Sequence, residues 1–276
     1  MNIGIRLHDT AGVTLAEHLS NAEQQGFSCV HLAMQKVIPG FKMGSAPELL
    51  TDDLAAEVKE TCAKYHQQLA VLGCYLNLAT PDPEELERTL AIYKAHLRFA
   101  RLTGAVVVGT ETGAPNTGYK TVPECWTEES LQLFIDRIRP VVRWAEEEGA
   151  IFAIEPVCRH IVNTPERAER VLDAIKSDNI QIILDTVNLL TPANHTQADA
   201  IIEESIRRFG DRIRILHMKD YQVVPGNVDL LSMGCGLGQM KYDRLLSFAR
   251  AHEGIPMTLE DTKPDNAVAA RLHLEK

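Results

Sequence analysis

The sequence lacks the long apolar run that a membrane-spanning helix requires. Its longest apolar runs, such as residues 105–109, fall far short of the roughly 20 residues that cross a bilayer. The first five residues, Met1-Asn2-Ile3-Gly4-Ile5, contain no basic stretch followed by an apolar one, so no secretory signal is readable. We therefore expect a protein that makes no contact with a membrane.

Paired cysteines and an excess of positive charge are also missing. The six cysteines, at positions 29, 62, 74, 125, 158 and 235, include no close pair and no Cys-x-x-Cys motif. In a chain of 276 residues this distribution predicts reduced, mostly buried thiols in a cytoplasmic protein. The formal net charge of −10 disfavours nucleic acid as a partner, because such binding depends on Lys and Arg to neutralise phosphates.

No linker rich in Pro, Gly or Ser interrupts the chain, so residues 1–276 are expected to form one domain. Short apolar segments alternate with longer helical patterns throughout. Strands are expected at residues 3–7, 29–33, 70–76, 105–109, 151–155, 181–185, 213–217 and 257–260. Their continuous apolar character is typical of parallel strands that are covered on both faces.

Helices are expected between these strands, and several have recognisable ends. Thr14 and Glu17 predict a capping box for a helix over residues 14–25. Gly104 and Gly149 predict the ends of helices over residues 83–103 and 127–148. Eight strand–helix repeats predict a single (β/α)8 TIM barrel with a short final helix, for which about 250 residues is the usual size. A doubly wound open sheet is the competing architecture.

Four of the later strands end in an acidic or imidazole side chain: Glu155, Asp185, His217 and Glu260. Barrel active sites lie at the carboxyl ends of the strands, so these four side chains are expected to converge. Three carboxylates and one imidazole suit a divalent metal ion, with Mn²⁺ or Mg²⁺ first and Co²⁺ or Zn²⁺ as alternatives. The competing interpretation, four unrelated strand-end groups, does not explain why the same position recurs in consecutive repeats.

The segments around these residues resemble the xylose isomerase-like superfamily of sugar isomerases and epimerases. The matching pieces are Ile154-Glu155-Pro156, Leu184-Asp185-Thr186, His217-Met218-Lys219-Asp220, Gly234-Cys235-Gly236 and Leu259-Glu260. The resemblance implies a xylose isomerase-like TIM barrel in which Glu155, Asp185, His217 and Glu260 bind the metal. It also implies that Glu155 and Glu260 flank the substrate as an acid–base pair. Relatives often form dimers or tetramers, so a homo-oligomer is a further implication.

The leading functional hypothesis is therefore a divalent-metal-dependent isomerase or epimerase of a small sugar or sugar derivative. One carboxylate would remove a proton next to a carbonyl to give an enediolate, and its partner would return a proton. A metal-dependent dehydratase or lyase of a cyclic polyol or keto acid is the alternative on the same barrel. A nuclease of the endonuclease IV type is disfavoured by the net charge, and a non-catalytic sugar-binding protein by the intact acid–base pair.

Three positions depart from the pattern of the ketose 3-epimerases in this superfamily. Arg159 is kept after Glu155, but Cys158 stands where Asn is usual and a second Glu is missing. Asn188 and Val223 occupy positions at which those epimerases tend to carry His and Arg. The expected substrate is therefore a different polyol, a sugar acid or a phosphorylated compound.

Four further residues are candidates for binding the carbohydrate substrate: His8, Glu111, Arg159 and Lys219. Lys219 lies two residues after His217, so both side chains should face the same side of a strand. It could bind a carboxylate or phosphate of the substrate, or form a salt bridge with a nearby carboxylate. For His8 a structural role, and for Glu111 a solvated loop position, are the competing interpretations.

Two other segments have open interpretations. The glycine run at residues 234–238 does not open a first βαβ unit, so it is no dinucleotide fingerprint and no nucleotide cofactor is expected. It could bring backbone close to a ligand, or it could be a plain loop. Residues 35–52 could form a lid over the barrel mouth or an ordinary surface loop.

Overall fold

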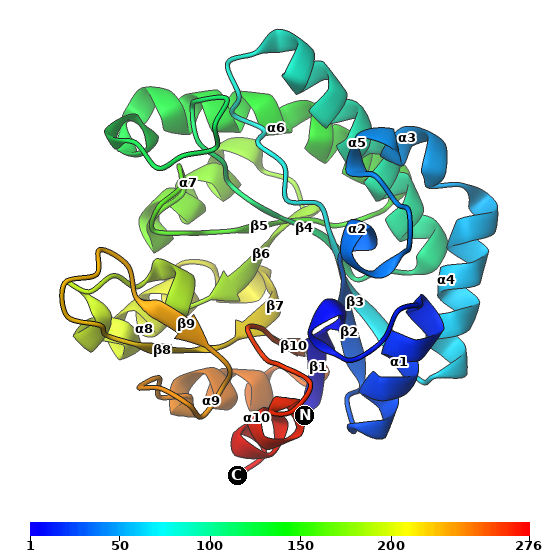
Figure 1. Cartoon of the computed structure of the whole chain (residues 1–276). Helices are drawn as coiled ribbons and strands as arrows, with labels where there is room; N and C mark the ends of the chain where they lie inside the picture. The colour runs from blue at the N-terminus through cyan, green and yellow to red at the C-terminus, as the bar shows by residue number, and fades with distance from the viewer.

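Eight parallel strands close into a barrel in the computed structural model, which describes all of residues 1–276 (Figure 1). The strand order around the barrel is β1-β10-β7-β6-β5-β4-β3-β2. The barrel closes because β1, the first strand in the sequence, pairs with β10, the last one. The barrel strands are β1 (Asn2–Arg6), β2 (Cys29–Leu32), β3 (Gln68–Gly73), β4 (Val107–Glu111), β5 (Phe152–Glu155), β6 (Ile180–Asp185), β7 (Ile213–Met218) and β10 (Pro256–Leu259). The predicted barrel is confirmed, and the pairing of β1 with β10 rules out the open sheet.

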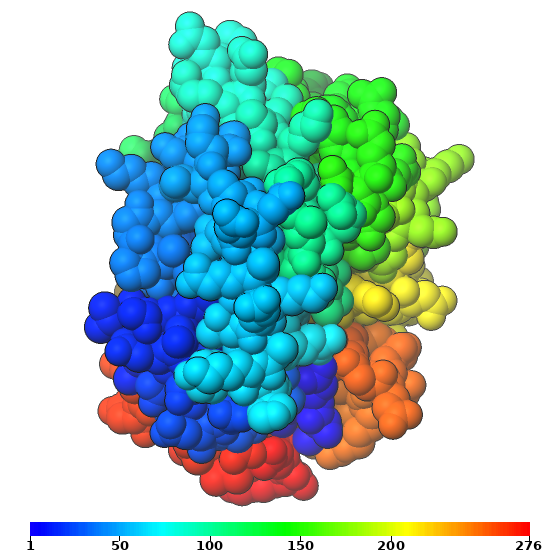
Figure 2. Space-filling model, turned by 90° about the vertical axis from the view of Figure 1, so that its right-hand side faces the viewer, coloured from blue at the N-terminus to red at the C-terminus, as the bar shows by residue number.

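Helices surround the barrel on its outer side (Figure 1), and Figure 2 shows the molecule from the side on which the N-terminal helices lie. They are α1 (Leu15–Gln24), α4 (Asp52–Lys64), α5 (Pro83–Thr103), α6 (Glu128–Glu148), α7 (Pro165–Ile175), α8 (Ala198–Phe209), α9 (Asp243–Ala251) and α10 (Ala267–Leu274). Thr14 and Glu17 form the predicted capping box at the start of α1. Gly104 and Gly149 end α5 and α6 in the left-handed conformation that glycine tolerates best. None of the helices combines the length and the apolar character that a bilayer crossing demands.

The structure differs from the sequence prediction at several boundaries. Strand β3 ends at Gly73 rather than at residue 76, and β4 continues to Glu111 rather than stopping at residue 109. A two-stranded antiparallel arm, β8 (Asp220–Gln222) with β9 (Leu231–Met233), follows β7 and was not predicted. Strands of three residues are too short to show a hydrophobic period, which explains the omission.

Residues 35–52 are not an irregular loop. They include most of α2 (Met34–Val37), the 3₁₀ turn η2 (Met43–Ser45) and α3 (Ala46–Leu49). All six cysteines are free thiols, and only Cys158 is partly exposed, as the sequence predicted.

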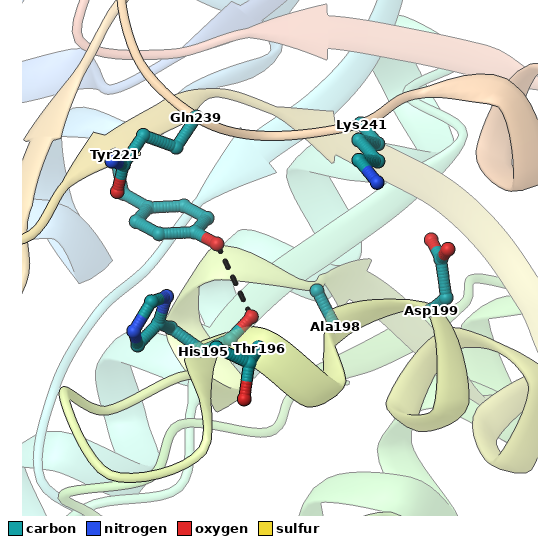
Figure 3. A pocket seen from close by; sticks show the side chains of 7 residues that line it. All are labelled: His195, Thr196, Ala198, Asp199, Tyr221, Gln239 and Lys241. Carbon is teal, nitrogen blue, oxygen red and sulfur yellow. Dashed lines mark hydrogen bonds between the residues drawn. The ribbon is translucent and has the colours of Figure 1, made fainter.

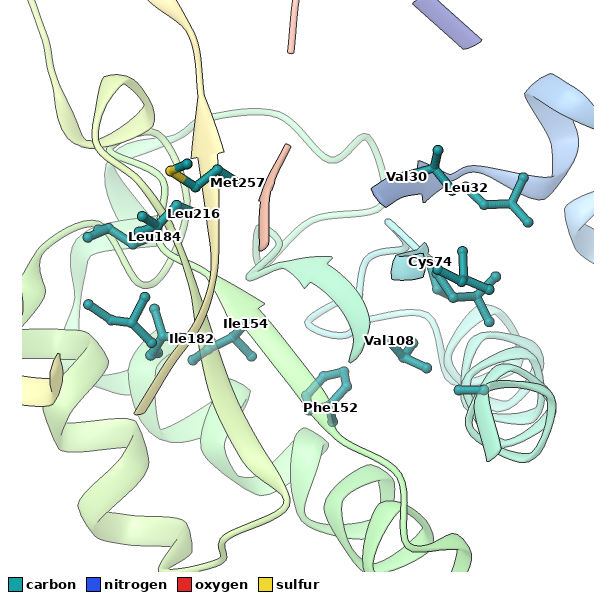
Figure 4. Packing of buried hydrophobic residues seen from close by; sticks show 14 of the residues in the cluster. Val30, Leu32, Cys74, Val108, Phe152, Ile154, Ile182, Leu184, Leu216 and Met257 are labelled. Carbon is teal, nitrogen blue, oxygen red and sulfur yellow. The ribbon is translucent and has the colours of Figure 1, made fainter. Parts of the chain in front are cut away.

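Side chains on each barrel strand alternate between two apolar layers. One layer packs against the helices and includes Val30, Ile154, Leu184, Leu216 and Met257 (Figure 4). The other fills the barrel interior and consists of Cys29, Val71, Val107, Ala153, Ile183 and Ile215, with Ala70 beside them. Because the period is two, the residue two positions after each interior residue also faces inward. This places His31, Gly73, Gly109, Glu155, Asp185 and His217 at the carboxyl end of the barrel interior.

Candidate active site at the barrel mouth

The four residues that end the later strands meet at the barrel mouth. His217 on β7 places its Nδ1 atom 3.2 Å from Glu155 Oε2 and 3.3 Å from Glu260 Oε1. Asp185 is paired with His217 in the strand register. All four side chains are buried, Asp185 completely so. The predicted convergence is therefore present in the structure.

The chemistry of this cluster fits a divalent cation. Ligand atoms of Glu155, Asp185 and His217 lie within 4.8 Å of one another, and so do those of His31, His217 and Glu260. The Nε2 atom of His217 is buried and has no hydrogen-bond partner. A buried polar atom without a partner costs about 1–3 kcal/mol, which coordination of a metal would remove. Carboxylates with imidazole suit Mg²⁺, Mn²⁺, Co²⁺ or Zn²⁺.

Lys219 and Asn188 connect the carboxylates of this cluster. The Lys219 ammonium lies 2.8 Å from Asp185 Oδ2 and 3.4 Å from Glu260 Oε2, and it donates to Asn188 Oδ1 at 2.9 Å. The Asn188 amide in turn donates to Glu155 Oε1 at 2.5 Å. The structure thus places Lys219 in a salt bridge, one of the two interpretations of this residue. Asn188, a position of departure from the ketose 3-epimerases, fixes the orientation of Glu155.

The buried charges shift one another's proton affinities. Burial alone would lower the pKa of His217, but the carboxylates of Glu260 and Glu155 outweigh it and raise the pKa to about 9. Burial likewise disfavours the charged form of Lys219, yet Asp185 and Glu260 raise its pKa above the usual range. Burial raises the pKa of Asp185 to about 6, although Lys219 opposes the shift. The cluster is therefore a set of opposite charges that stabilise one another in a site shielded from water.

A cavity of about 450 Å³ opens above these residues. Glu155 and Glu260 line it, whereas Asp185 and His217 lie beneath its surface. All four predicted substrate-binding residues, His8, Glu111, Arg159 and Lys219, line the cavity as well. Residues 35, 36 and 43 form part of its wall, so the segment over residues 35–52 borders the mouth.

The rim of the cavity carries groups that suit carbohydrate hydroxyls. Glu111 ends β4 and is paired in register with Glu155; it accepts a hydrogen bond from the Tyr119 hydroxyl at 3.3 Å. Burial and the charge of Glu155 raise the pKa of Glu111 to about 7, so near neutral pH it can donate or accept. Arg159 is half-exposed and pairs with Asp229 at 3.2 Å.

Several cavity-lining residues were not singled out by the sequence prediction, among them Arg6, His31, Tyr75 and, within the segment over residues 35–52, Lys36. Arg6 is the last residue of β1 and lies 3.0 Å from Asp261; the sequence placed the end of this strand one residue later, at residue 7. Lys36 carries the only ammonium or guanidinium group of the lining with no carboxylate within 4.0 Å. It donates to His8 Nε2 at 3.4 Å. Burial, with the charges of Arg6 and Lys36, lowers the pKa of His8 to about 3.

The glycine run at residues 234–238 approaches a carboxylate of the chain itself. The buried Asp220 side chain accepts backbone N–H bonds from Gly236 and Gly238 on one oxygen, and from Tyr221 and Met240 on the other. A Cβ atom on Gly238 would lie 2.2 Å from the Tyr221 carbonyl oxygen, so only glycine fits there. The run does not line the cavity. The backbone of this run therefore approaches Asp220 of the chain itself, rather than the ligand that the sequence analysis considered.

A second hollow, of about 380 Å³, lies outside the barrel mouth between the start of α8 and the β8–β9 arm (Figure 3). The Tyr221 hydroxyl donates to the backbone carbonyl of His195 across it, at 3.2 Å. Asp199 and Lys241 also face it, but it holds no cluster of the kind found at the mouth.

The sequence and the fold match known proteins. The family model described as xylose isomerase-like TIM barrel matches residues 19–276. A curated relative, D-psicose 3-epimerase of Enterocloster bolteae, is 28% identical over 163 residues, which cover 56% of this chain and 50% of that protein. The match thus spans about half the length of that relative.

Solved structures of similar fold cover this whole chain. They include the IOLI protein with a bound zinc atom (TM-score 0.75, 19% identity, 96% of that chain covered). They also include 3-keto-D-glucoside 4-epimerase of E. coli (TM-score 0.75, 17% identity, 99% covered). A third is the probable 3-DHS dehydratase of Bacillus anthracis (TM-score 0.74, 12% identity, 98% covered). At these identities the likeness concerns the fold.

Proposed function

The chain belongs to the xylose isomerase-like TIM barrel family, and from this premise we propose that it is a divalent-metal-dependent isomerase or epimerase of a small sugar derivative. The observation that carries the proposal is the pair Glu155 and Glu260. Both carboxylates line the cavity, and each has one oxygen within 3.3 Å of the same His217 nitrogen. Two such groups around one substrate can remove a proton from one face of a carbon and return one to the opposite face, as epimerisation requires, and they can also serve proton transfer between neighbouring carbons. The similarity to D-psicose 3-epimerase supports this reaction class.

Asp185 and His217 would hold the cation from beneath, and Glu155 and Glu260 would complete its ligand set from the cavity side. When bound, a divalent cation such as Mn²⁺ or Mg²⁺ polarises a substrate carbonyl and so acidifies the adjoining C–H bond.

Glu155 and Glu260 would carry out the proton transfers to and from the substrate carbon. Asn188 holds one oxygen of Glu155, while Lys219 and Arg6 face one oxygen of Glu260, so both carboxylates are oriented before substrate arrives. One carboxylate takes the proton from carbon and the other returns one. Return to the neighbouring carbon gives isomerisation, and return to the opposite face of the same carbon gives epimerisation.

The substrate proposed for this cavity carries an anionic group, a carboxylate or a phosphate. Lys36 supports this choice, because it is the cavity-lining cation that no carboxylate of the chain neutralises. His8, Glu111 and Arg159 would bind hydroxyl groups of the same molecule. Residues 1–276 would act as one domain, in the cytoplasm, on a small molecule.

The test is a screen of ketoses, sugar acids and sugar phosphates in D₂O with added Mn²⁺, read by NMR. Deuterium at a single carbon of one compound is the expected result, and its position identifies the reaction. A product that has lost water would instead assign the dehydratase reaction. Absence of exchange and of turnover across the screen, with metal bound, would contradict the proposal.

A further inference from the structure

One buried side chain of the barrel mouth has no role in the proposed acid–base chemistry. His31 on β2 is 2% exposed, and neither of its ring nitrogens has a hydrogen-bond partner. Leaving a buried polar atom unpaired costs free energy of folding. An apolar residue of similar size would avoid that cost. We therefore expect the imidazole to bind a partner that is not part of the chain.

The position of His31 identifies the kind of partner. Its ring is stacked on that of His217, with centroids 5.4 Å apart and planes 13° apart. Its Nδ1 atom lies 3.8 Å from Glu260 Oε1, the same oxygen that lies 3.3 Å from His217 Nδ1. Ligand atoms of His31, His217 and Glu260 are within 4.8 Å of one another. His31 thus borders the space around which the other four ligand candidates converge.

The neighbouring strand leaves space for this imidazole because it has a glycine at the position that faces the ring. Gly73 on the neighbouring strand β3 faces it, and a Cβ atom at that position would lie 2.7 Å from His31 Nε2. The Tyr75 ring lies beside the imidazole at a centroid distance of 5.7 Å. The other ring nitrogen, Nδ1, lies 3.8 Å from Glu260 Oε1.

We propose that His31 is an additional nitrogen ligand of the divalent cation, beside Glu155, Asp185, His217 and Glu260. This inference rests on the proposed function, since it assumes that those four residues bind a metal. A second imidazole changes the character of the site, because nitrogen donors favour borderline ions over hard ones. The expected preference is therefore for Co²⁺ or Zn²⁺ over Mg²⁺.

The experiment compares metal binding by the metal-stripped wild-type protein and by His31→Gln, using Co²⁺ absorption spectra and titration with Zn²⁺ and Mg²⁺. Loss of a residue that only orients a ligand already costs roughly 10–100-fold in metal affinity, so His31→Gln should weaken Co²⁺ and Zn²⁺ by at least that factor. Its visible Co²⁺ spectrum should change, and its Mg²⁺ affinity should change far less. The matched control is His8→Gln, which alters another cavity-lining imidazole and should keep the wild-type spectrum.

A second variant guards against misfolding of His31→Gln. Gly73→Ala keeps every ligand but displaces the imidazole, and it should lower Zn²⁺ affinity while retaining Mg²⁺ affinity. Wild-type Co²⁺ spectra and Zn²⁺ affinity in a folded His31→Gln protein would overturn the inference and leave the proposed function standing. If the wild-type protein bound none of these ions, the proposed function would fail together with the inference.

Discussion

The Asp220 carboxylate is the best place to test how the loop beside the mouth is held. Each of its oxygens accepts two backbone N–H bonds, at distances of 2.7–3.0 Å, and the side chain is 1% exposed. In Asp220→Asn the amide has one oxygen and one NH₂ group. Whichever way the amide turns, two backbone N–H donors will face another donor.

The magnitude follows from those two lost bonds. A hydrogen bond to a charged group contributes about 1.5–3 kcal/mol, so the variant should lose about 3–6 kcal/mol of unfolding free energy. This is a large part of the 5–15 kcal/mol that is typical of a folded protein. With a urea dependence of about 3 kcal/mol per molar, the unfolding midpoint should fall by roughly 1–2 M.

The assay is urea unfolding followed by circular dichroism, combined with amide hydrogen exchange of Gly236, Gly238 and Met240. Asp173→Asn is the matched control, since Asp173 is exposed on α7 and makes no hydrogen bond or salt bridge. That control should stay within about 0.5 kcal/mol of the wild-type stability. If Asp220→Asn behaved like the control and its three amides exchanged as slowly as in the wild type, the reasoning about Asp220 would be refuted.

Three further predictions concern the site and the stability of the protein. Glu155→Gln and Glu260→Gln should each lower deuterium exchange into the identified substrate by about 10²–10⁴-fold, and wild-type exchange in both would exclude the acid–base pair. Lys36→Ala should weaken inhibition by a sugar acid by about tenfold but leave a neutral polyol unchanged, and equal losses for both would exclude an anion contact at Lys36. Burial lowers the pKa of His96 to about 4, so the unfolded chain takes up this proton near pH 6.5 and the folded chain only near pH 4. The free energy of unfolding should therefore fall by about 3 kcal/mol between pH 6.5 and pH 4 on account of His96. Urea unfolding across this range should show a smaller decrease for His96→Gln than for the wild type, and an equal decrease would contradict the assignment.

The sequence predicts the barrel and the four strand-end residues because both depend on short-range patterns. Continuous apolar segments mark the strands, and a polar residue at the end of each segment must reach the mouth once the barrel closes. Glu155, Asp185 and His217 follow this rule directly. Arg6 ends β1 in the structure, but the apolar segment that marks this strand runs on to Leu7, so the pattern does not indicate Arg6 as a strand-end residue.

His31, Tyr75 and Lys36 are harder to predict because their positions depend on long-range geometry. A single histidine inside an apolar strand has two possible faces, and only the closed barrel decides that His31 points inward. Lys36 reaches the cavity because α2 follows β2 at the mouth. The role of Asp220 depends on a loop that returns to it 16 to 20 residues later, which no local pattern reveals.

The pairing of β10 with both β1 and β7 also bears on the order in which the molecule is made. Until β10 emerges from the ribosome, strands β1 to β7 can form only an open sheet with two unpaired edges, which are natural sites for association with other chains. About 40 residues separate the end of β7 from the end of β10, which at 5–20 residues per second corresponds to roughly 2–8 s of synthesis. The chain segment that closes these edges is followed directly by Glu260, so the nascent sheet gains the second of its two proposed acid–base carboxylates at the same stage as its unpaired edges disappear.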